Sequence, residues 1–169
     1  MTRPMSDGVS EEPIVIDASD DQSEIQIDLD RWRDLMSAAL SAEGIAGPGE
    51  ATLTFIDAGE MTELNREHMG VDGPTDVLSF PIDGAEPLSG RVPRMVGDIV
   101  ICPSVAAANA PAHAGDVDSE LALLVVHGVL HLLGHDHAEN DGRAVMQERE
   151  RNLLGELWGP LAADPWAVV

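Results

Sequence analysis

Residues 121–134 read LALLVVHGVLHLLG, a run that is apolar around the whole helical circumference except for two histidines. The apolar segment from Asp118 to Leu133 is long enough for several helical turns and predicts a buried α-helix. His127 and His131 are four residues apart, which puts their Cβ atoms about 5–6 Å apart on one face of that helix. Two imidazoles buried side by side are costly unless they share a partner, so the pair predicts a common ligand.

The histidines continue past this helix in the sequence HGVLHLLGHDH, residues 127–137. Gly134 is a natural end for the helix, because glycine adopts the left-handed conformation that reverses the chain. His137 can then approach the ion that His127 and His131 bind. Three imidazoles fill three positions of a tetrahedral zinc ion and leave the fourth for water, whose pKa falls to about 7 on the metal. We therefore expect one Zn²⁺ per chain and a hydrolytic site.

The two other residues of this cluster have different expected roles. By its spacing His135 points away from the ion, and we interpret it as a surface residue. Asp136 has two interpretations of equal weight: it orients a ligand histidine, or it acts on the bound water. Asp136 is therefore a candidate catalytic residue.

The spacing H-x-x-x-H-x-x-G-x-x-H is also that of the metzincin proteases. Those enzymes carry a glutamate directly after the first histidine as the general base, and here that position is Gly128. Glycine cannot transfer protons. A zinc metallopeptidase with a displaced general base is therefore an alternative and not the leading hypothesis.

The rest of the chain predicts an α+β domain with one mixed four-stranded sheet packed against helices. Strand patterns occur at 13–17, 51–57, 75–81 and 96–102, and 24–29 either extends the first strand or pairs with it. Helical patterns occur at 31–42, from Gly59 to His68, and at 104–113, 118–133 and 143–158. Asp30 is the expected N-cap of the first helix.

The composition suits one globular domain. The chain has 169 residues, 44% of them apolar, and a mean hydropathy of −0.03. We expect a disordered acidic tail at 1–13, a single hydrolase domain at 14–160 and a C-terminal tail at 161–169. No apolar run approaches the roughly 20 residues that span a bilayer, and the N-terminus does not resemble a signal peptide. With Cys102 as the only cysteine, the expected location is the cytoplasm, without a membrane partner.

The net charge opposes the binding of a polyanion. Nine basic residues, all arginine, stand against 31 acidic residues and give a formal charge of −22. A field of that sign repels nucleic acids. We expect no DNA partner, and the binding of an RNA substrate must overcome the electrostatic repulsion from this net charge.

The motif HGVLHLLGHDH resembles the signature of the YbeY family of bacterial endoribonucleases and rRNA maturation factors. The resemblance extends through LNREHMGVDGPTDVLSFP (64–81), GDIVICP (97–103) and the helix with Ala144, Met146 and Glu148, and spans roughly 14–159. It implies the family's metal-dependent hydrolase fold, with the three histidines 127, 131 and 137 as zinc ligands. The implied substrate is single-stranded RNA, principally the 3′ end of the 16S rRNA precursor. Implied partners are proteins of the small ribosomal subunit and of ribosome quality control.

One segment departs from the family's pattern. After Leu64 the family often has Tyr-Arg with further basic residues, whereas this chain has His68-Met69. The family's arginine, a candidate contact to the substrate phosphate, is thus not carried over to Met69. Arg66 lies three residues earlier, close to one helical turn away, and is the candidate that supplies the charge. A solvated helix residue is the alternative interpretation of Arg66.

Three further polar segments have two interpretations each. Residues 74–76, Pro-Thr-Asp, form a turn that feeds a strand, and their polar groups alternatively line the cleft. Asp98 is either a base beside the metal-binding helix or the cap of a loop. The run Glu-Arg-Glu-Arg at 148–151 is more simply a solvated helix face of mixed charge than a binding patch.

Together with the histidine spacing, the resemblance to the YbeY family implies a zinc-dependent single-strand endoribonuclease in 16S rRNA 3′-end maturation and ribosome quality control. The attacking group is either the metal-bound water or the ribose 2′-hydroxyl. Besides the metallopeptidase, the alternative is a non-catalytic ribosome-assembly factor with a structural zinc. In that protein His135 or Asp136 would be the fourth ligand.

Overall fold

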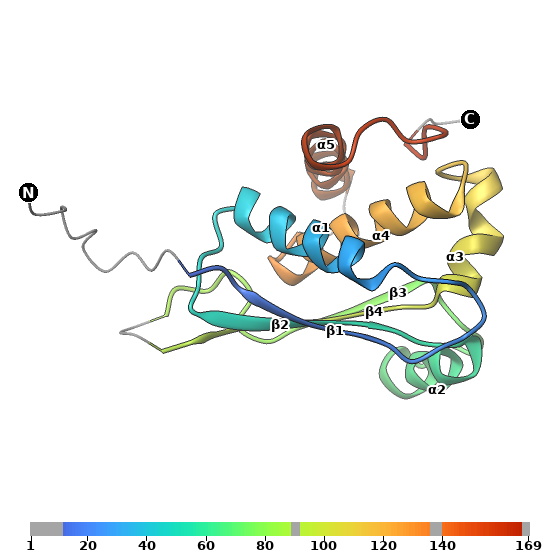
Figure 1. Ribbon diagram of the computed structural model, residues 1–169, viewed down its shortest axis with the longest axis horizontal. Coiled ribbons are helices and arrows are strands. Elements are labelled where there is room, and N and C mark those ends of the chain that lie inside the picture. Colours follow the sequence, from blue (N-terminus) through green and yellow to red (C-terminus); the bar gives the residue numbers. More distant parts are fainter. Residues whose placement is uncertain (1–11, 89–91, 136–139, 167–169) are drawn as a thin grey trace, which may run out of the picture.

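A single sheet forms the base of the fold, with most helices on one of its faces (Figure 1). The computed structural model describes residues 12–88, 92–135 and 140–166. The described strands are β1 (Val15–Asp20), β2 (Gly49–Phe55), β3 (Val77–Pro81) and β4 (Arg94–Ile101), in the order β1-β2-β4-β3. β1, β2 and β4 are parallel, and β3 is antiparallel to β4. The expected mixed four-stranded sheet is confirmed.

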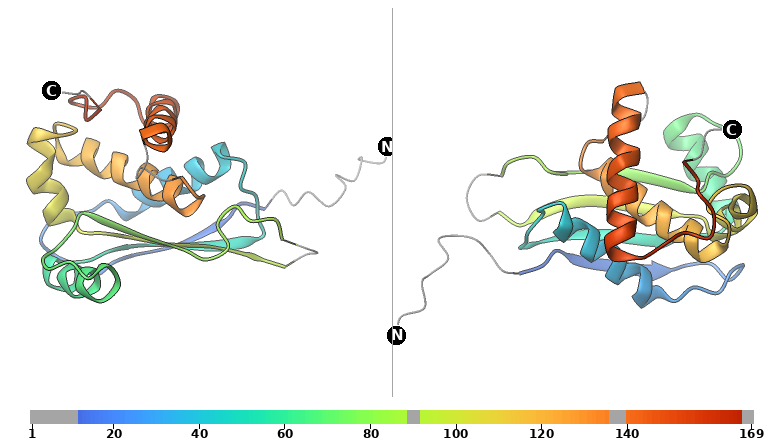
Figure 2. Two further views of the ribbon diagram at one scale, coloured as in Figure 1. Left: turned by 180° about the vertical axis from the view of Figure 1, so that it is seen from behind. Right: turned by 90° about the horizontal axis from the view of Figure 1, so that it is seen from above.

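The helices form further layers. The described helices are α1 (Leu29–Ala42), α2 (Ala58–Met69), α3 (Pro103–Asn109), the 3-10 turn η1 (Ala110–Ala112), α4 (Val117–Leu132) and α5 (Asn140–Leu157). α1 and α4 cover one face of the sheet, α5 crosses over them, and α2 lies on the opposite face at one end (Figures 1 and 2). The α+β class is therefore confirmed. None of the helices in the described part of the chain is long and apolar enough to cross a membrane.

α4 is the centre of the core, as its sequence predicts. It packs between α1, α5 and the sheet, and twelve of its sixteen residues are buried. Alternate residues of the sheet point at it: Leu53 and Phe55 from β2, and Ile99 and Ile101 from β4, are fully buried. Because α4 has apolar neighbours on nearly every side, a helix that is apolar all round is stable there.

Gly128 allows α4 to approach β4 closely. A Cβ atom at this position would lie 2.9 Å from Cδ1 of Ile99. The residue that follows His127 thus faces the packed side of the helix, where a longer side chain would collide with the sheet. The glutamate of the protease motif would require the Ile99 side chain to shift away from α4.

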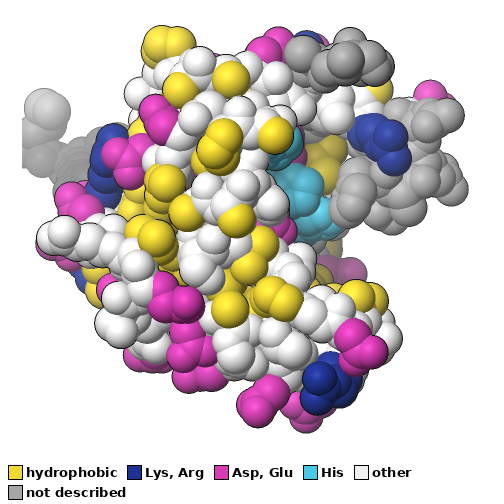
Figure 3. All heavy atoms as spheres, turned by 90° about the vertical axis from the view of Figure 1, so that its right-hand side faces the viewer, with side chains coloured by type: hydrophobic (Ala, Val, Ile, Leu, Met, Phe, Trp, Pro, Cys, Tyr) yellow, Lys and Arg dark blue, Asp and Glu magenta, His cyan; other side chains and the backbone are white. Residues whose placement is uncertain are grey.

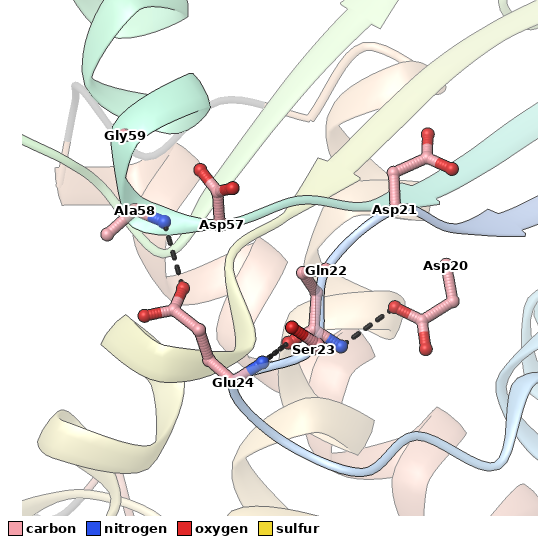
Figure 4. Close-up of a pocket in the computed structure, with 8 residues that line it drawn as sticks. All are labelled: Asp20, Asp21, Gln22, Ser23, Glu24, Asp57, Ala58 and Gly59. Atoms are coloured by element: carbon pink, nitrogen blue, oxygen red, sulfur yellow. Dashed lines mark hydrogen bonds between the residues drawn. The ribbon is translucent and has the colours of Figure 1, made fainter.

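The segment between β1 and α1 is a loop, so the strand expected at 24–29 is wrong. The side-chain oxygen of Gln22 accepts hydrogen bonds from the backbone N–H groups of Glu24 and Ile25, both at 3.0 Å. The Glu24 carboxylate in turn accepts a hydrogen bond from the backbone N–H of Ala58 at 3.1 Å, at the start of α2 (Figure 4). Local side-chain hydrogen bonds compete here with strand pairing, and the alternation pattern does not reveal them.

Some element ends also differ from expectation. α1 begins at Leu29 with Asp28 as its N-cap, and the Asp28 side chain accepts a hydrogen bond from the Arg31 backbone N–H. The expected cap, Asp30, lies in the first turn instead. α5 begins at Asn140, before the expected start at 143.

The residues after α5 fold back onto the start of α4. The backbone N–H of Ala163 donates to the carbonyl of Ala114 at 2.7 Å, and that of Ala162 donates to Oγ of Ser119 at 3.1 Å. Residues 161–166, the described part of the expected C-terminal tail, therefore pack on the helical layer. The domain boundaries proposed from the sequence stay a prediction.

Candidate metal centre

α4 brings the two histidines together at their ring nitrogens. The Nε2 atoms of His127 and His131 are 3.0 Å apart, and the ring planes are inclined by 76°. A tetrahedral zinc ion bound at about 2.0–2.1 Å separates two ligand nitrogens by about 3.3 Å. The two nitrogens thus converge on one point with nearly the separation that a shared ion requires.

A buried carboxylate fixes the orientation of the first histidine. Nδ1 of His127 donates to Oε1 of Glu150 on α5 at 2.5 Å, and Glu150 is only 4% exposed. An ionised carboxylate only accepts hydrogen bonds, so the proton of the neutral ring is held on Nδ1 and the lone pair on Nε2. A carboxylate behind a histidine in this way is the usual support of a metal ligand. The residues present therefore fit a metal ion.

Glu150 is a functional residue that the sequence analysis missed. The run 148–151 was expected to be a solvated helix face, and this is wrong for Glu150, which is buried. It is wrong in part for Arg149, which binds the Glu43 carboxylate at 2.7 Å and whose pKa is raised by that hydrogen bond. The signal in the sequence is the helical spacing of Glu150 with Met146 and Leu154, both buried on the same side of α5.

The other oxygen of Glu150 is held by the C-terminal segment. Nε1 of Trp166 donates to Oε2 at 2.8 Å. The guanidinium of Arg151 lies over the Trp166 ring, 5.2 Å from its centre. Glu150 therefore connects α4, α5 and the last described residues of the chain.

The chain turns after the second histidine as predicted. Gly134 has a φ of +98°, and the backbone N–H of His135 donates to the carbonyl of Leu130 at 3.0 Å. His135, expected on the surface, is half-buried. Asp136 and His137 lie outside the described residues, so their roles stay predictions.

Two histidines alone do not complete a metal site. Within residues 12–88, 92–135 and 140–166, no group of three or more His, Cys, Asp or Glu side chains is arranged to hold a metal ion. A third protein ligand must come from elsewhere, and the sequence predicts His137.

A pocket opens beside the histidine pair, and we call it the histidine pocket. Its volume is about 310 Å³, and it is lined by Asp76, Val77, His113, Leu123, Leu124, His127, Arg143, Met146, Gln147, Glu150, Pro165 and Trp166. On the face shown in Figure 3, histidine side chains gather in a hollow of the surface. The pocket thus joins the edge strand β3, α4, α5 and the C-terminal segment.

Asp76 satisfies both interpretations of the turn at 74–76. Its carboxylate accepts hydrogen bonds from the Val77 backbone N–H at 2.8 Å and from Oγ1 of Thr75 at 3.4 Å, which is turn chemistry. It also lines the histidine pocket. The Asp76 carboxylate therefore lies at the histidine pocket, directly before the start of β3.

Asp98 has neither of the two expected roles. It lies inside β4 and accepts a hydrogen bond from Oγ1 of Thr52 at 2.6 Å. Its neighbour Ile99 faces Gly128 on α4, so Asp98 points to the opposite face of the sheet. It is neither a base beside α4 nor a loop cap.

Arg66 lies apart from the histidine pair. It sits on α2, on the other side of the sheet (Figure 1), is exposed, and forms an ion pair with Asp72 at 3.3 Å. Arg66 does not line the histidine pocket. A contact between Arg66 and an RNA phosphate stays a prediction, and it requires a substrate that extends beyond the pocket.

A second imidazole in the pocket also escaped the sequence analysis. His113 follows η1, and its Nδ1 is 2.8 Å from Oε2 of Glu120, which is fully buried in the first turns of α4. The local sign of this pair is a glutamate next to the apolar run that begins at Leu121.

Known proteins are similar to this chain in sequence and in fold. A family model described as Endoribonuclease YbeY matches residues 17–158. The endoribonuclease YbeY of Pelotomaculum thermopropionicum is 43% identical over 119 residues, which cover 70% of this chain and 78% of that protein. That of Salinispora tropica is 40% identical over 141 residues, which cover 79% and 90%. Among solved structures, the solution structure of TM1509 from Thermotoga maritima matches with a TM-score of 0.58 and 27% identity, over 86% of this chain and 90% of that one.

Proposed function

The chain belongs to the endoribonuclease YbeY family, a family of metal-dependent nucleases, and we propose that it cleaves single-stranded RNA at a zinc ion held by His127, His131 and His137. The observation that carries this proposal is the convergence of the Nε2 atoms of His127 and His131, with Nδ1 of His127 held by Glu150. Imidazole ligands with one coordination position left open are typical of catalytic zinc.

The zinc ion, Glu150 and Asp136 have different tasks in this proposal. Bound zinc supplies the positive charge that polarises a phosphodiester. Glu150 keeps the His127 ring in one tautomer and one orientation, so that no reorganisation is needed when the ion binds. Asp136 either supports a ligand histidine in the same way or assists the attacking group.

The packing of α4 favours RNA over peptides as the substrate. Peptide hydrolysis needs a group that takes a proton from the attacking water and then passes it to the leaving amine. The position of that group in the protease motif is Gly128, which is packed against Ile99. The leaving alkoxide of a phosphodiester needs less help of this kind. The same packing therefore disfavours the metallopeptidase.

The proposed setting is the maturation of the 16S rRNA 3′ end in the cytoplasm. With a formal charge of −22, the chain repels RNA at long range, so its affinity for free RNA is expected to be low. Proteins of the small ribosomal subunit would then supply the local concentration of substrate that electrostatics does not.

The test compares RNA with a protein substrate. Zinc-loaded protein is incubated with single-stranded RNA and with an unfolded protein, beside a His127→Ala control, with and without ribosomal particles. We expect RNA cleavage that disappears in the control. Proteolysis that disappears in the control while the RNA stays intact would overturn the proposal. A 2′,3′-cyclic phosphate on the products would identify the ribose 2′-hydroxyl as the attacking group.

A further inference from the structure

The histidine pocket contains an imidazole held by a buried carboxylate that is separate from the histidine pair. Nδ1 of His113 lies 2.9 Å from Oε1 and 2.8 Å from Oε2 of Glu120. Oε1 also accepts a hydrogen bond from the backbone N–H of Ala114 at 3.1 Å. The Glu120 side chain is 0% exposed and that of His113 is 42% exposed. The imidazole thus stands between a buried anion and the pocket.

This arrangement prepares His113 to accept a proton. A buried carboxylate is stable only when hydrogen-bonded, and the ring N–H and the Ala114 N–H meet that need. The carboxylate therefore holds the ring proton on Nδ1 and leaves the lone pair on Nε2. Among the residues that the structure describes, no hydrogen bond to Nε2 of His113 occurs.

The position of the pair relative to the proposed zinc ligands suits an in-line displacement. Glu120 and His127 are seven residues apart on α4, two turns along one side of the helix and about 10 Å along its axis. Leu123 and Leu124 line the pocket in the interval between them. The attacking and leaving oxygens of a phosphoryl transfer lie on opposite sides of phosphorus. Both His113 and His127 line the pocket, so an imidazole held by Glu120 and one of the proposed zinc ligands face the same cavity.

We propose that His113 is the catalytic base of RNA cleavage and that Glu120 is its positioning residue. Nε2 of His113 takes the proton of the ribose 2′-hydroxyl, a bond forms from O2′ to phosphorus, and the bond from phosphorus to O5′ breaks. The products are a 2′,3′-cyclic phosphate and a 5′-hydroxyl, whose oxygen takes its proton from water. This inference rests on the proposed function, and it supplies the base that Gly128 cannot provide.

A purely structural role for the pair makes different predictions. In that case His113 only donates a hydrogen bond to Glu120 and anchors the turn before α4. Its replacement would then lower stability, and small molecules in solution would not restore the rate. A base that touches the substrate can instead be replaced by free imidazole in the space that the side chain leaves.

The experiment measures cleavage of a short single-stranded RNA by zinc-loaded protein. The variants are His113→Ala, which leaves a space, and His113→Gln, which keeps an N–H donor for Glu120. The matched control is His68→Ala, an exposed histidine on α2. We expect both His113 variants to lose a factor of about 100 or more in kcat with unchanged zinc content, and added imidazole to restore part of the rate of His113→Ala alone. RNA with a 2′-deoxy group at the cleaved position should stay intact.

The outcomes separate this inference from the proposed function. Wild-type protein that cleaves no RNA overturns both. Wild-type cleavage with His113→Ala and His113→Gln near the wild-type rate overturns the role of His113 alone. Products with a 5′-phosphate, or a loss of activity that imidazole does not restore, also overturn it while the zinc site stands.

Discussion

At the scale of single residues, the Glu150 carboxylate is held firmly in the site, because each of its two oxygens accepts a hydrogen bond from a ring N–H group. His127 Nδ1 and Trp166 Nε1 donate to it at 2.5 and 2.8 Å. The buried carboxylate fixes the orientation of the ring and strengthens its other nitrogen as a metal ligand. The strength of the proposed metal site therefore depends on a residue that does not touch the ion.

Replacement of Glu150 by Gln should weaken zinc binding without removing it. The amide keeps the shape but loses the charge behind His127, and we expect an affinity lower by a factor of about 10–100. Competition with a chelator of known affinity measures this. Glu148→Gln, at an exposed position on the same helix, is the matched control, and an equal affinity in both variants would contradict the prediction.

The histidines should differ sharply in their effect on metal content. His131→Ala removes one of the two converging nitrogens, so we expect elemental analysis to find little zinc. His135→Ala should keep about one zinc per chain. Full zinc content in His131→Ala would contradict the assignment of this residue as a ligand.

At the scale of elements, the segment after α5 contributes to the site together with α5. Trp166 lines the histidine pocket and binds Glu150. Arg151, one position after Glu150, packs over the same indole ring. The last described residues thus limit how far α5 can move away from α4.

Trp166→Phe should loosen this contact while it keeps an aromatic ring in place. Oε2 of Glu150 loses its donor, and an unsatisfied buried acceptor costs about 1–3 kcal/mol. We expect lower stability towards denaturant and weaker zinc binding than in the wild type. Arg151→Gln, which leaves the indole donor intact, is the comparison, and an unchanged zinc affinity in Trp166→Phe would show that the segment is not needed for the site.

The start of α4 gives a pH-dependent prediction. Asp116 is the N-cap, and the hydrogen bond from the Ser119 backbone N–H lowers its pKa. A lowered folded-state pKa means that the stabilisation is complete above the unfolded value of about 3.9 and is lost as the pH falls through the folded value. Asp116→Ala should cost about 1 kcal/mol at pH 7. Denaturant titrations should show this difference shrink below about pH 4, and a difference that persists there would contradict the assignment.

At the scale of the whole molecule, the acidic surface decides how RNA is bound. The chain has nine arginines and no lysine. Four of the arginines form ion pairs with carboxylates in the described structure, namely Arg31, Arg33, Arg66 and Arg149. With a formal charge of −22, the chain offers little net attraction to phosphates, so counterion release contributes little to affinity.

The affinity for free single-stranded RNA should accordingly depend weakly on salt. If one or two phosphates are neutralised, the slope of log K against log salt concentration is about −1. Fluorescence anisotropy between 50 and 200 mM salt, about the range over which basic proteins lose most of their affinity, measures this slope. A slope of about −5, as for a protein with several phosphate contacts, would disagree with the charge argument.

The sequence alone determined the features that depend on local spacing. The long, nearly continuous apolar run predicted α4 as a buried helix. The i, i+4 spacing put His127 and His131 on one face, and Gly134 marked the turn after them because only glycine adopts its φ of +98° easily. These properties arise within a few residues of chain, where backbone geometry leaves few alternatives.

Only the tertiary structure decided which distant residues support these histidines. Glu150 is 23 residues from His127, and Trp166 is 16 residues further on. From the sequence alone, a charged residue in a helix is interpreted as exposed to solvent. Glu150 is buried only because α5 packs over α4, and packing likewise buries Glu120 beneath His113. The packing of α4 on one side of β4 likewise decided that Asp98 points to the opposite face of the sheet. Burial depends on how whole elements pack, and no local pattern contains that information.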